Sequence, residues 1–364
     1  MRTSTPASEV LTSVESFKAI GPEWDRLASV FTSPLLTHDW FFSAAATLHR
    51  DDRLAIFLRK SGERIVAAAP MVECRRMGLR RLEFIGSATL CEPSGFVYER
   101  PTDLRLVLGD VLERRLPVQI DRVCDPLLVA ELTALHTDSV EVVRKSVAPI
   151  PWIRIAGSWD DYYATISPKW RSAHRRAAKK AGAAGRVGFE FHKPGPDQFG
   201  RLMGRFVDVE AQNWKGRRGT ALRTNDSLHA FFQKYGMLAS RRGILRLGVL
   251  RIGDDPVAGH FGVDYAGRHW VLKIGFDERF AACSPGILLM YKMLERAFDE
   301  KLDAFEFLGS NETWIRIWNH KTRKYYSRTI DQVPVRRLLA RTFSLTEKVG
   351  GRIATRLAKA VRRT

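Results

Sequence analysis

The sequence predicts an α+β protein of two domains, each with a mixed, mostly antiparallel sheet flanked by helices. Its 364 residues suit two domains of roughly 150–200 residues each, and a hydrophobic content of 45% is ordinary for a globular protein. Residues 245–276 have the pattern of three strands joined by hairpin turns, and a helix and a further strand follow them. A weaker pattern of strand, Gly turn and strand occurs at residues 54–72.

The first half begins with helical segments around Trp24 and Trp40 and continues with strands. We expect strands at 54–58, 65–72 and 82–85, and two more near the domain boundary at 140–143 and 152–155. The sequence Arg-Ile-Val-Ala-Ala at 64–68 echoes Asp-Pro-Val-Ala-Gly at 255–259, which favours a duplicated domain. We expect domain boundaries at 1–150 and 151–331, followed by a tail at 332–364.

The second half shows its strands one at a time. Leu245, Leu247 and Val249 alternate with Arg246, Gly248 and Leu250, which is the pattern of a half-buried strand. A Gly-Asp-Asp-Pro turn at 253–256 leads into a return strand at 257–265, and a second turn at 266–268 leads into a strand at 270–276. A helix then begins at Ser284-Pro285-Gly286, because Ser is a good cap and Pro suits the first helical position. The backbone N–H groups of such a helix start favour an anion.

The net charge of +19 predicts an anionic partner. The segment 166–186 holds seven Lys or Arg residues and no acid, and most of it is an expected helix at 167–181. Helical spacing places two of these cations, Arg171 and Arg175, on one face. The helix is either a solvated surface helix or an anion-binding one. The tail from 335 to 364 has nine basic residues against Glu347 and an amphipathic pattern, so it is either an ordinary terminal helix or a peripheral contact with an anionic membrane. Nucleic acid is a less favoured partner, because no groove-reading motif accompanies the charge.

Several function classes are disfavoured by composition. The four cysteines are far apart and the histidines lack metal-ligand spacing, so we expect no metal site. No apolar run reaches about 18 residues, and the N-terminus lacks the apolar core of a signal peptide. We therefore expect a cytoplasmic protein, with contact at the inner membrane face left open.

Three residues are candidates for a general base. Glu210 lies four residues before Trp214 on an expected helix at 206–214, and His260 and Asp264 share one face of the strand at 257–265. Each has a plainer alternative: Glu210 as a surface carboxylate, and His260 as a histidine satisfied within the core.

Four segments carry a family resemblance: Pro-Lys-Trp-Arg at 168–171, the strand at 245–250, Ser-Pro-Gly-Ile-Leu-Leu at 284–289, and Phe-Glu-Phe-Leu-Gly at 305–309. In this order they resemble the CelD-like branch of the GNAT acyltransferase superfamily, the acetyltransferase 6 type of domain, which is related to Fem-type transferases. The resemblance covers about residues 165 to 327. It implies tandem GNAT-like domains, with residues 1–150 as a degenerate copy.

The resemblance also implies a reaction. Such enzymes move an acetyl or other acyl group from acyl-CoA to an amine or hydroxyl, here with a polysaccharide or cell-envelope precursor as a candidate acceptor. The diphosphate is expected on the turn formed by Ala282, Cys283, Ser284, Pro285 and Gly286, and the pantetheine arm along the strand edge that includes Lys273 and Gly275. Acceptor-binding candidates are Arg171, Arg175, Trp214 and Trp314.

One departure from the family pattern keeps other functions open. The family usually carries Tyr-Lys before a Trp, whereas this chain has Trp314-Ile315, with Arg316 as the neighbouring cation. A Fem-like aminoacyl transferase that uses charged tRNA is the first alternative. A non-catalytic tandem scaffold that binds anions or membranes is the second.

Overall fold

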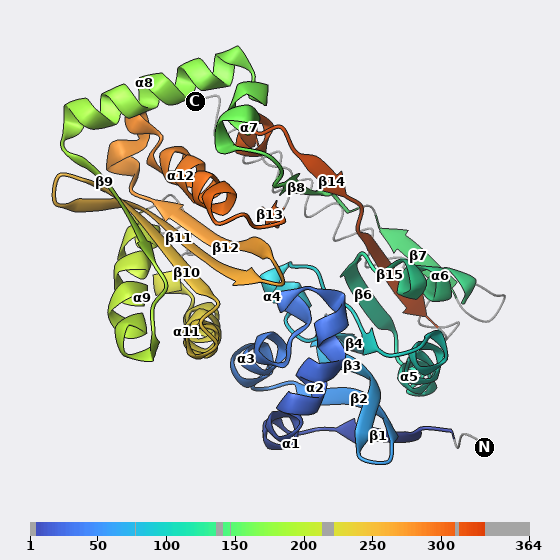
Figure 1. The fold of residues 1–364 in the computed structure, drawn as a ribbon. Coiled ribbons are helices and arrows are strands. Elements are labelled where there is room, and N and C mark those ends of the chain that lie inside the picture. Colours follow the sequence, from blue (N-terminus) through green and yellow to red (C-terminus); the bar gives the residue numbers. More distant parts are fainter. Residues whose placement is uncertain are drawn as a thin grey trace.

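The protein was analysed as a computed structural model, which describes residues 5–76, 78–135, 141–145, 147–212, 222–309 and 313–331. Two mixed sheets flanked by helices form the described part, which confirms the predicted fold class (Figure 1). The expected strands at 54–58, 65–72, 245–250, 257–265 and 270–276 lie within observed strands, and the one expected at 82–85 overlaps a strand that ends at Phe84. The segment around Trp314 forms a short 3-10 helix, Thr313–Ile317.

The first sheet has the strand order β1-β2-β3-β4-β6-β15-β7, and β5 pairs with β3. Its pairs are antiparallel except β4 with β6, which is parallel. Helices α2 and α5 pack on it, and α3 lies beside the second sheet's helix α11. The bounds are β1 Ala7–Leu11, α1 Val14–Ala19, α2 Gly21–Ala28, α3 His38–Leu48, β2 Arg53–Ser61, β3 Arg64–Arg76, β4 Leu79–Phe84, α4 Ser87–Leu90, β5 Val97–Tyr98, α5 Pro101–Glu113, β6 Val118–Val123, α6 Pro126–Ala134, β7 Glu141–Lys145 and β15 Tyr326–Asp331.

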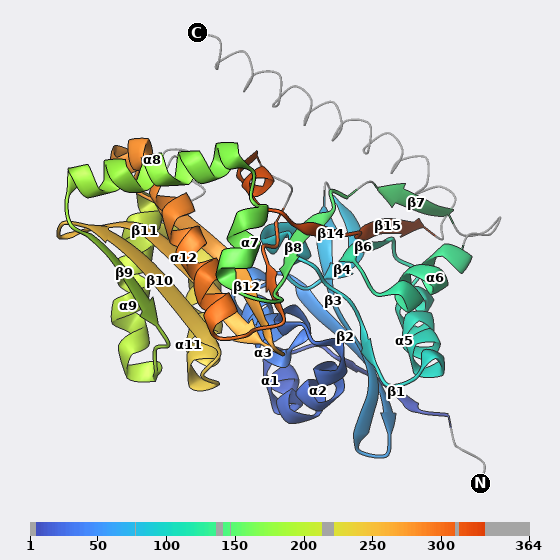
Figure 2. The same cartoon turned by 45° about the horizontal axis from the view of Figure 1, so that its top comes forward.

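The second sheet has the order β14-β8-β13-β12-β11-β10-β9, with β12 parallel to β13 and the other pairs antiparallel. Helix α12 covers one face, and α9 and α11 cover the other (Figures 1 and 2). The bounds are β8 Ile150–Arg154, α7 Trp159–Thr165, α8 Pro168–Ala184, β9 Val187–His192, α9 Pro196–Ala211, α11 Asp226–Arg241, β10 Leu245–Ile252, β11 Asp255–Tyr265, β12 Arg268–Phe276, α12 Pro285–Asp299, β13 Ala304–Glu306 and β14 Lys321–Arg323, with 3-10 turns η3 Leu222–Thr224, η4 Glu278–Cys283 and η5 Thr313–Ile317.

The two sheets have the same plan. In each, four antiparallel strands are followed by a parallel fifth strand (β6 or β13) and then by an antiparallel sixth. The sixth strand of the first sheet is β15, from the end of the described chain, and the sixth strand of the second sheet is β8, from the start of the second half. The expected boundary at 331 would leave β15 in the second domain, whereas its hydrogen bonds join it to the first sheet. The domain boundaries at 1–150 and 151–331 stay a prediction.

A continuous apolar core joins the two halves. Trp40 of α3 lies edge-on to both Phe231 and Tyr235 of α11, with ring centroids 5.0 Å apart in each pair. The same buried cluster includes residues of α1, α2, β2 and β3 from the first half and of α9, β10 and β11 from the second. Arg242 adds ion pairs with Asp25 and Asp39 across this junction. The packing fixes one half against the other and so shapes the space between them.

Candidate active site between the two halves

The edge of β12 opens where its parallel neighbour ends. Arg268, His269 and Trp270 pair with Ala304, Phe305 and Glu306 of β13, and β13 stops there. Residues 271–276 of β12 therefore extend beyond the last β13 partner. This geometry gives β12 a stretch of strand edge that an extended ligand can follow.

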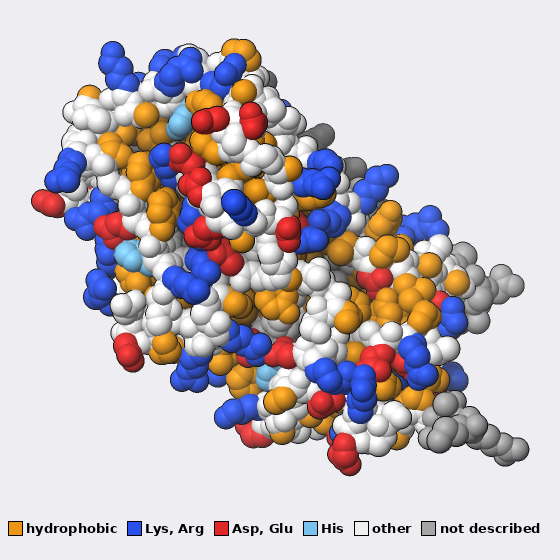
Figure 3. Space-filling view, viewed as in Figure 1, with side chains coloured by type: hydrophobic (Ala, Val, Ile, Leu, Met, Phe, Trp, Pro, Cys, Tyr) orange, Lys and Arg blue, Asp and Glu red, His pale blue; other side chains and the backbone are white. Residues whose placement is uncertain are grey.

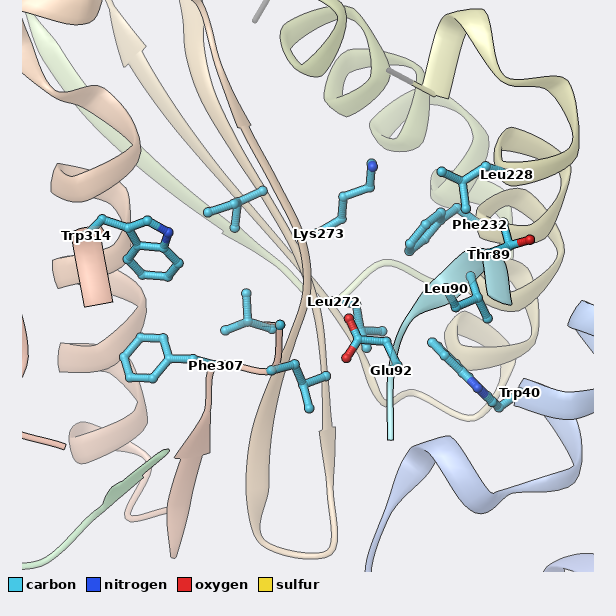
Figure 4. Close-up of a pocket in the computed structure, with 14 residues that line it drawn as sticks. Trp40, Thr89, Leu90, Glu92, Leu228, Phe232, Leu272, Lys273, Phe307 and Trp314 are labelled. Carbon is cyan, nitrogen blue, oxygen red and sulfur yellow. The ribbon is translucent and has the colours of Figure 1, made fainter. Parts of the chain in front are cut away.

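A cavity of about 350 Å³ lies at this opened edge and reaches the first half of the protein. This is the size of a small-ligand site. Its walls come from five segments: α3, α4 with the turn after it, α11, the opened part of β12, and the chain from the end of β13 into η5 (Figure 4). The lining residues are Trp40, Thr89, Leu90, Glu92, Leu228, Phe232, Val271, Leu272, Lys273, Ile274, Phe307, Leu308, Gly309 and Trp314.

Two predicted site residues, Lys273 and Trp314, line this cavity, and a third reaches it through Lys273. The Nζ atom of Lys273 lies 3.3 Å from Oε1 of Glu210 and 5.6 Å from the centre of the Phe232 ring. The Oε2 atom of Glu210 accepts a hydrogen bond of 2.9 Å from the backbone N–H of Leu222. Glu210 is fully buried at the end of α9, so the plainer reading of it as a surface carboxylate is wrong. Its carboxylate anchors Lys273 beside the cavity.

Gly275 has a packing role that the sequence did not reveal. A Cβ atom at this position would lie 2.7 Å from the Cα atom of Glu210, closer than real Cβ atoms approach. The absence of a side chain lets the end of α9 pack directly on β12. Gly275 thus brings Glu210 to Lys273, and its proposed place along a bound pantetheine arm stays a prediction.

The Ser284 turn lies at the end of β12, where α12 begins. Ser284 has a left-handed backbone conformation with φ of 47°, and its N–H donates to the Ala281 carbonyl, while its own carbonyl accepts from Ile287 and Leu288. The Ser284 N–H is therefore already hydrogen-bonded within the turn and is not available to a ligand. An anion at this turn would be attracted by the positive end of the α12 dipole. Cys283 is buried against α8 and α12, and a Cβ at Gly286 would contact Phe276 at 3.4 Å.

The basic helix α8 runs over η4 and the beginning of α12. Ala177 and Ala181 are the buried residues of α8, and its cations lie on the other faces, as the blue side chains along α8 in Figure 3 show. Arg175 is exposed, whereas Arg171 is half-buried and its Nε atom has no hydrogen-bond partner among the described residues. Neither arginine lines the cavity beside β12. Both lie on the element that approaches the Ser284 turn.

His260 and Asp264 belong to a buried network on the α12 face of the sheet. His260 Nε2 lies 2.8 Å from His269 Nε2, and His269 Nδ1 lies 2.6 Å from Asp264 Oδ1. Arg246 and Arg296 pair with the same Asp264 carboxylate. The two residues therefore share a network as well as a strand face, and neither lines the cavity.

The protonation of this network follows from burial and charge. Burial lowers the pKa of His260 and of His269, with neighbouring positive groups acting in the same direction on both. Burial alone would raise the pKa of Asp264, but the hydrogen bond from His269 and the charge of Arg296 hold it below its ordinary value. A deprotonated, multiply paired carboxylate is a stable counter-ion and a weak base. These observations favour a structural role for Asp264.

Glu92 is the carboxyl group that lines the cavity, and the sequence patterns gave no sign of it. It follows Cys91, whose backbone is left-handed with φ of 56°, in the turn that ends α4. Oε2 of Glu92 is buried without a hydrogen-bond partner among the described residues, while the carboxyl group accepts a hydrogen bond from the Gly309 backbone. Burial raises the pKa of Glu92 to about 8, against smaller opposing effects of Arg122 and the Gly309 N–H.

The remaining predictions concern residues outside this arrangement. Trp214 and the tail at 335–364 lie outside the described residues. Ile315, at the position where the family usually carries Lys, is fully buried in the core beneath α12, and Arg316 is exposed. Within the described ranges, no group of three or more His, Cys, Asp or Glu side chains is arranged to hold a metal ion. None of the described helices is long and apolar enough to cross a membrane.

Comparison with known proteins assigns the second half of the chain to a domain class. Residues 168–316 match the family model described as an acetyltransferase (GNAT) domain. This segment contains β9 to β13, α8, α12 and the Ser284 turn. This segment is therefore similar to a GNAT acetyltransferase domain. The finer CelD-like assignment remains a proposal.

Solved structures with similar folds cover nearly the whole chain. The crystal structure of FemX aligns with a TM-score of 0.62 at 10% identity, covering 91% of this chain and 99% of FemX. The C-terminal domain of a putative lysylphosphatidylglycerol synthetase from Agrobacterium fabrum aligns with a TM-score of 0.55 at 11% identity (91% and 96% covered). L-PGS from Bacillus licheniformis gives 0.54 at 13% identity (90% and 96% covered). At these identities the likeness shows the fold alone, and no curated protein matches the sequence.

Proposed function

We propose that the protein transfers an acetyl or other acyl group from acyl-CoA to an amine or hydroxyl acceptor, with a polysaccharide or cell-envelope precursor as the candidate acceptor. The observation that carries this proposal is the opened edge of β12, which leads from the Ser284 turn into the cavity between the halves. An acyl-CoA is long enough to reach from the Ser284 turn to the cavity, since the pantetheine arm separates its diphosphate from its thioester.

Each part of the donor has a matching protein group. The diphosphate lies at the first turn of α12, where the helix dipole and the nearby cations of α8 favour negative charge. The amide groups of the pantetheine arm pair with the β12 edge at 271–276, as an added strand would. The thioester carbonyl then lies at the cavity, where a backbone N–H can polarise it and the acceptor nitrogen or oxygen attacks the carbonyl carbon.

Calorimetric titration with acetyl-CoA and longer acyl-CoAs tests the donor assignment. We expect saturable binding, and a Gly286→Glu variant that binds roughly tenfold more weakly, because a negative charge at a helix start opposes a bound diphosphate by about 1–2 kcal/mol. Gly204→Glu on the exposed side of α9 is the matched control, since a Cβ there meets nothing within 4 Å. Absence of binding to every acyl-CoA would overturn the proposal.

Aminoacyl transfer from a charged tRNA is the second candidate function. The likeness of the fold to FemX and the net charge of +19 favour it. Binding to tRNA would weaken steeply with salt, since phosphate contacts release counter-ions. Salt-sensitive tRNA binding by a protein that binds no acyl-CoA would select this function over the first.

Membrane contact through residues 335–364 is a separate proposal. It rests on the nine basic residues and the apolar pattern of that segment. Flotation with phosphatidylglycerol vesicles should capture the full chain and leave a chain ending at Asp331 in solution. Equal capture of the two chains would show that the tail is not the membrane contact. Capture of the full chain by vesicles, together with a lack of acyl transfer, would favour the non-catalytic alternative.

A further inference from the structure

Two left-handed turns, one from each half of the protein, meet at the Glu92 side chain. Cys91 has a φ of 56° immediately before Glu92, and Leu308 and Gly309 have φ values of 55° and 66° immediately after β13. Non-glycine residues rarely adopt this conformation, which costs of order 1 kcal/mol, and such residues gather at functional sites. Here the second turn directs the Gly309 N–H to the Glu92 carboxyl group.

The surroundings of Glu92 are mainly apolar. In Figure 4 the carboxyl group lies beside Leu272 of β12, Leu90 and Trp40 of the first half lie to its right, and Phe307 lies on the opposite side of β12. Arg122 acts on the Glu92 carboxyl group through its charge. Lys273 lines the same cavity, but its amine pairs with Glu210 and points away from Glu92 in Figure 4. Its Oε2 atom is buried and lacks a hydrogen-bond donor within the described residues. A buried carboxyl oxygen without a hydrogen-bond partner is costly, so the site favours a ligand that supplies one.

We propose that this cavity holds the acceptor as a primary amine with an apolar body and that Glu92 accepts the proton of its ammonium group. This inference rests on the proposed function and names the acceptor class and the base. An ammonium group supplies the missing donor and the opposite charge, and the ring faces of the cavity favour a cation. A hydroxyl acceptor would supply a hydrogen-bond donor but no positive charge.

The proposed step balances as follows. The ammonium group gives one proton to the Glu92 carboxylate and becomes a neutral amine. Its nitrogen attacks the thioester carbonyl, the C–N bond forms and the C–S bond breaks, and the thiolate leaves with the proton that the new amide nitrogen loses. Glu92 then releases its proton to solvent. With a pKa raised by burial, Glu92 is better matched to this transfer than an ordinary carboxylate.

Infrared spectroscopy tests the amine site without any donor. At pH 7 the wild-type protein should show the C=O band of a protonated carboxyl group, which Glu92→Gln lacks and Glu63→Gln, altered in the exposed β2–β3 turn, retains. Added hexylamine should remove this band, because the ammonium group stabilises the carboxylate, whereas hexanol should leave it. A band that hexylamine does not change, or that persists in Glu92→Gln, would overturn the proposal.

Acyl transfer from acetyl-CoA to hexylamine tests the role of Glu92 as base. Glu92→Gln should lower kcat/KM by roughly 10²–10⁴-fold at pH 7 and move its rise with pH to the higher pH at which the free amine itself loses its proton, with the acetyl-CoA Kd unchanged. Glu92→Asp should recover part of the rate. A Glu92→Gln variant with the wild-type rate and pH profile would refute the assignment. Loss of acetyl-CoA binding by the wild type refutes only the donor assignment, since the infrared result stands without it.

Discussion

At the scale of single residues, three carboxyl groups near β12 differ in what surrounds them. Asp264 is paired with His269 and two arginines, and Glu210 is bonded to the Leu222 N–H and lies beside Lys273. Glu92 receives one backbone hydrogen bond in an apolar wall. The same functional group is therefore a counter-ion, an anchor and a proposed base.

The stability of the protein should depend on pH through Glu92. Its pKa in the folded state is raised to about 8, above the unfolded value of about 4.3, so between these pH values the folded state binds more protons and stability falls as pH rises. Glu92→Gln removes this loss. In thermal unfolding, the Tm of the variant minus that of the wild type should therefore be higher at pH 9 than at pH 5. The same Tm difference at both pH values would contradict the raised pKa.

Replacement of Asp264 separates a structural role from a catalytic one. Asp264→Asn leaves Arg246 and Arg296 without their buried counter-ion, so we expect a loss of roughly 3–5 kcal/mol in the free energy of unfolding at neutral pH. Because the pKa of Asp264 is lowered, this stabilisation is present above about pH 4 and is lost on further acidification. Urea unfolding measures it. A variant of wild-type stability that has lost acyl transfer would instead support Asp264 as the base.

At the scale of elements, the end of α9 and strand β12 form a unit that depends on Gly275. Gly275→Val would place side-chain atoms against the Glu210 backbone and should destabilise the protein by about 1–3 kcal/mol. Gly188→Val on the edge strand β9, where a Cβ meets nothing within 4 Å, is the control and should cost less. Urea unfolding of both variants measures the difference, and equal stability would show that α9 can move away from β12.

The elements that the sequence predicted well are those with a strong local pattern. Alternation at 245–250, the turns at 253–256 and 266–268, and the Ser-Pro-Gly helix start placed β10, β11, β12 and α12 correctly. The strand β14 has three residues and therefore too few for a recognisable alternation. Glu92 had no signal, because its burial arises only when the turn after β13 approaches the turn after α4.

At the scale of the whole molecule, β15 ties the first sheet to the end of the described chain, because it lies between β6 and β7. No local sequence pattern specifies this return of the chain to the first sheet. The return of β15 and the contacts of Trp40 hold together the two halves that line the cavity.

Truncation tests this dependence. A chain ending at Asp331 keeps β15 and should unfold in one transition near the wild-type temperature. A chain ending at Lys324 leaves β6 and β7 without the strand between them and should lose the first half's cooperative unfolding. Differential scanning calorimetry distinguishes the two, and equal transitions for both chains would contradict the structural importance of β15.

The most direct test of the central claim is hydrogen–deuterium exchange with and without acetyl-CoA. A donor that pairs with the opened edge should protect backbone amides at 271–276 and at the start of α12, and leave β1 and β2 unchanged. Protection confined to other segments, or none at saturating acetyl-CoA, would contradict the assignment of β12 and the Ser284 turn as the donor site.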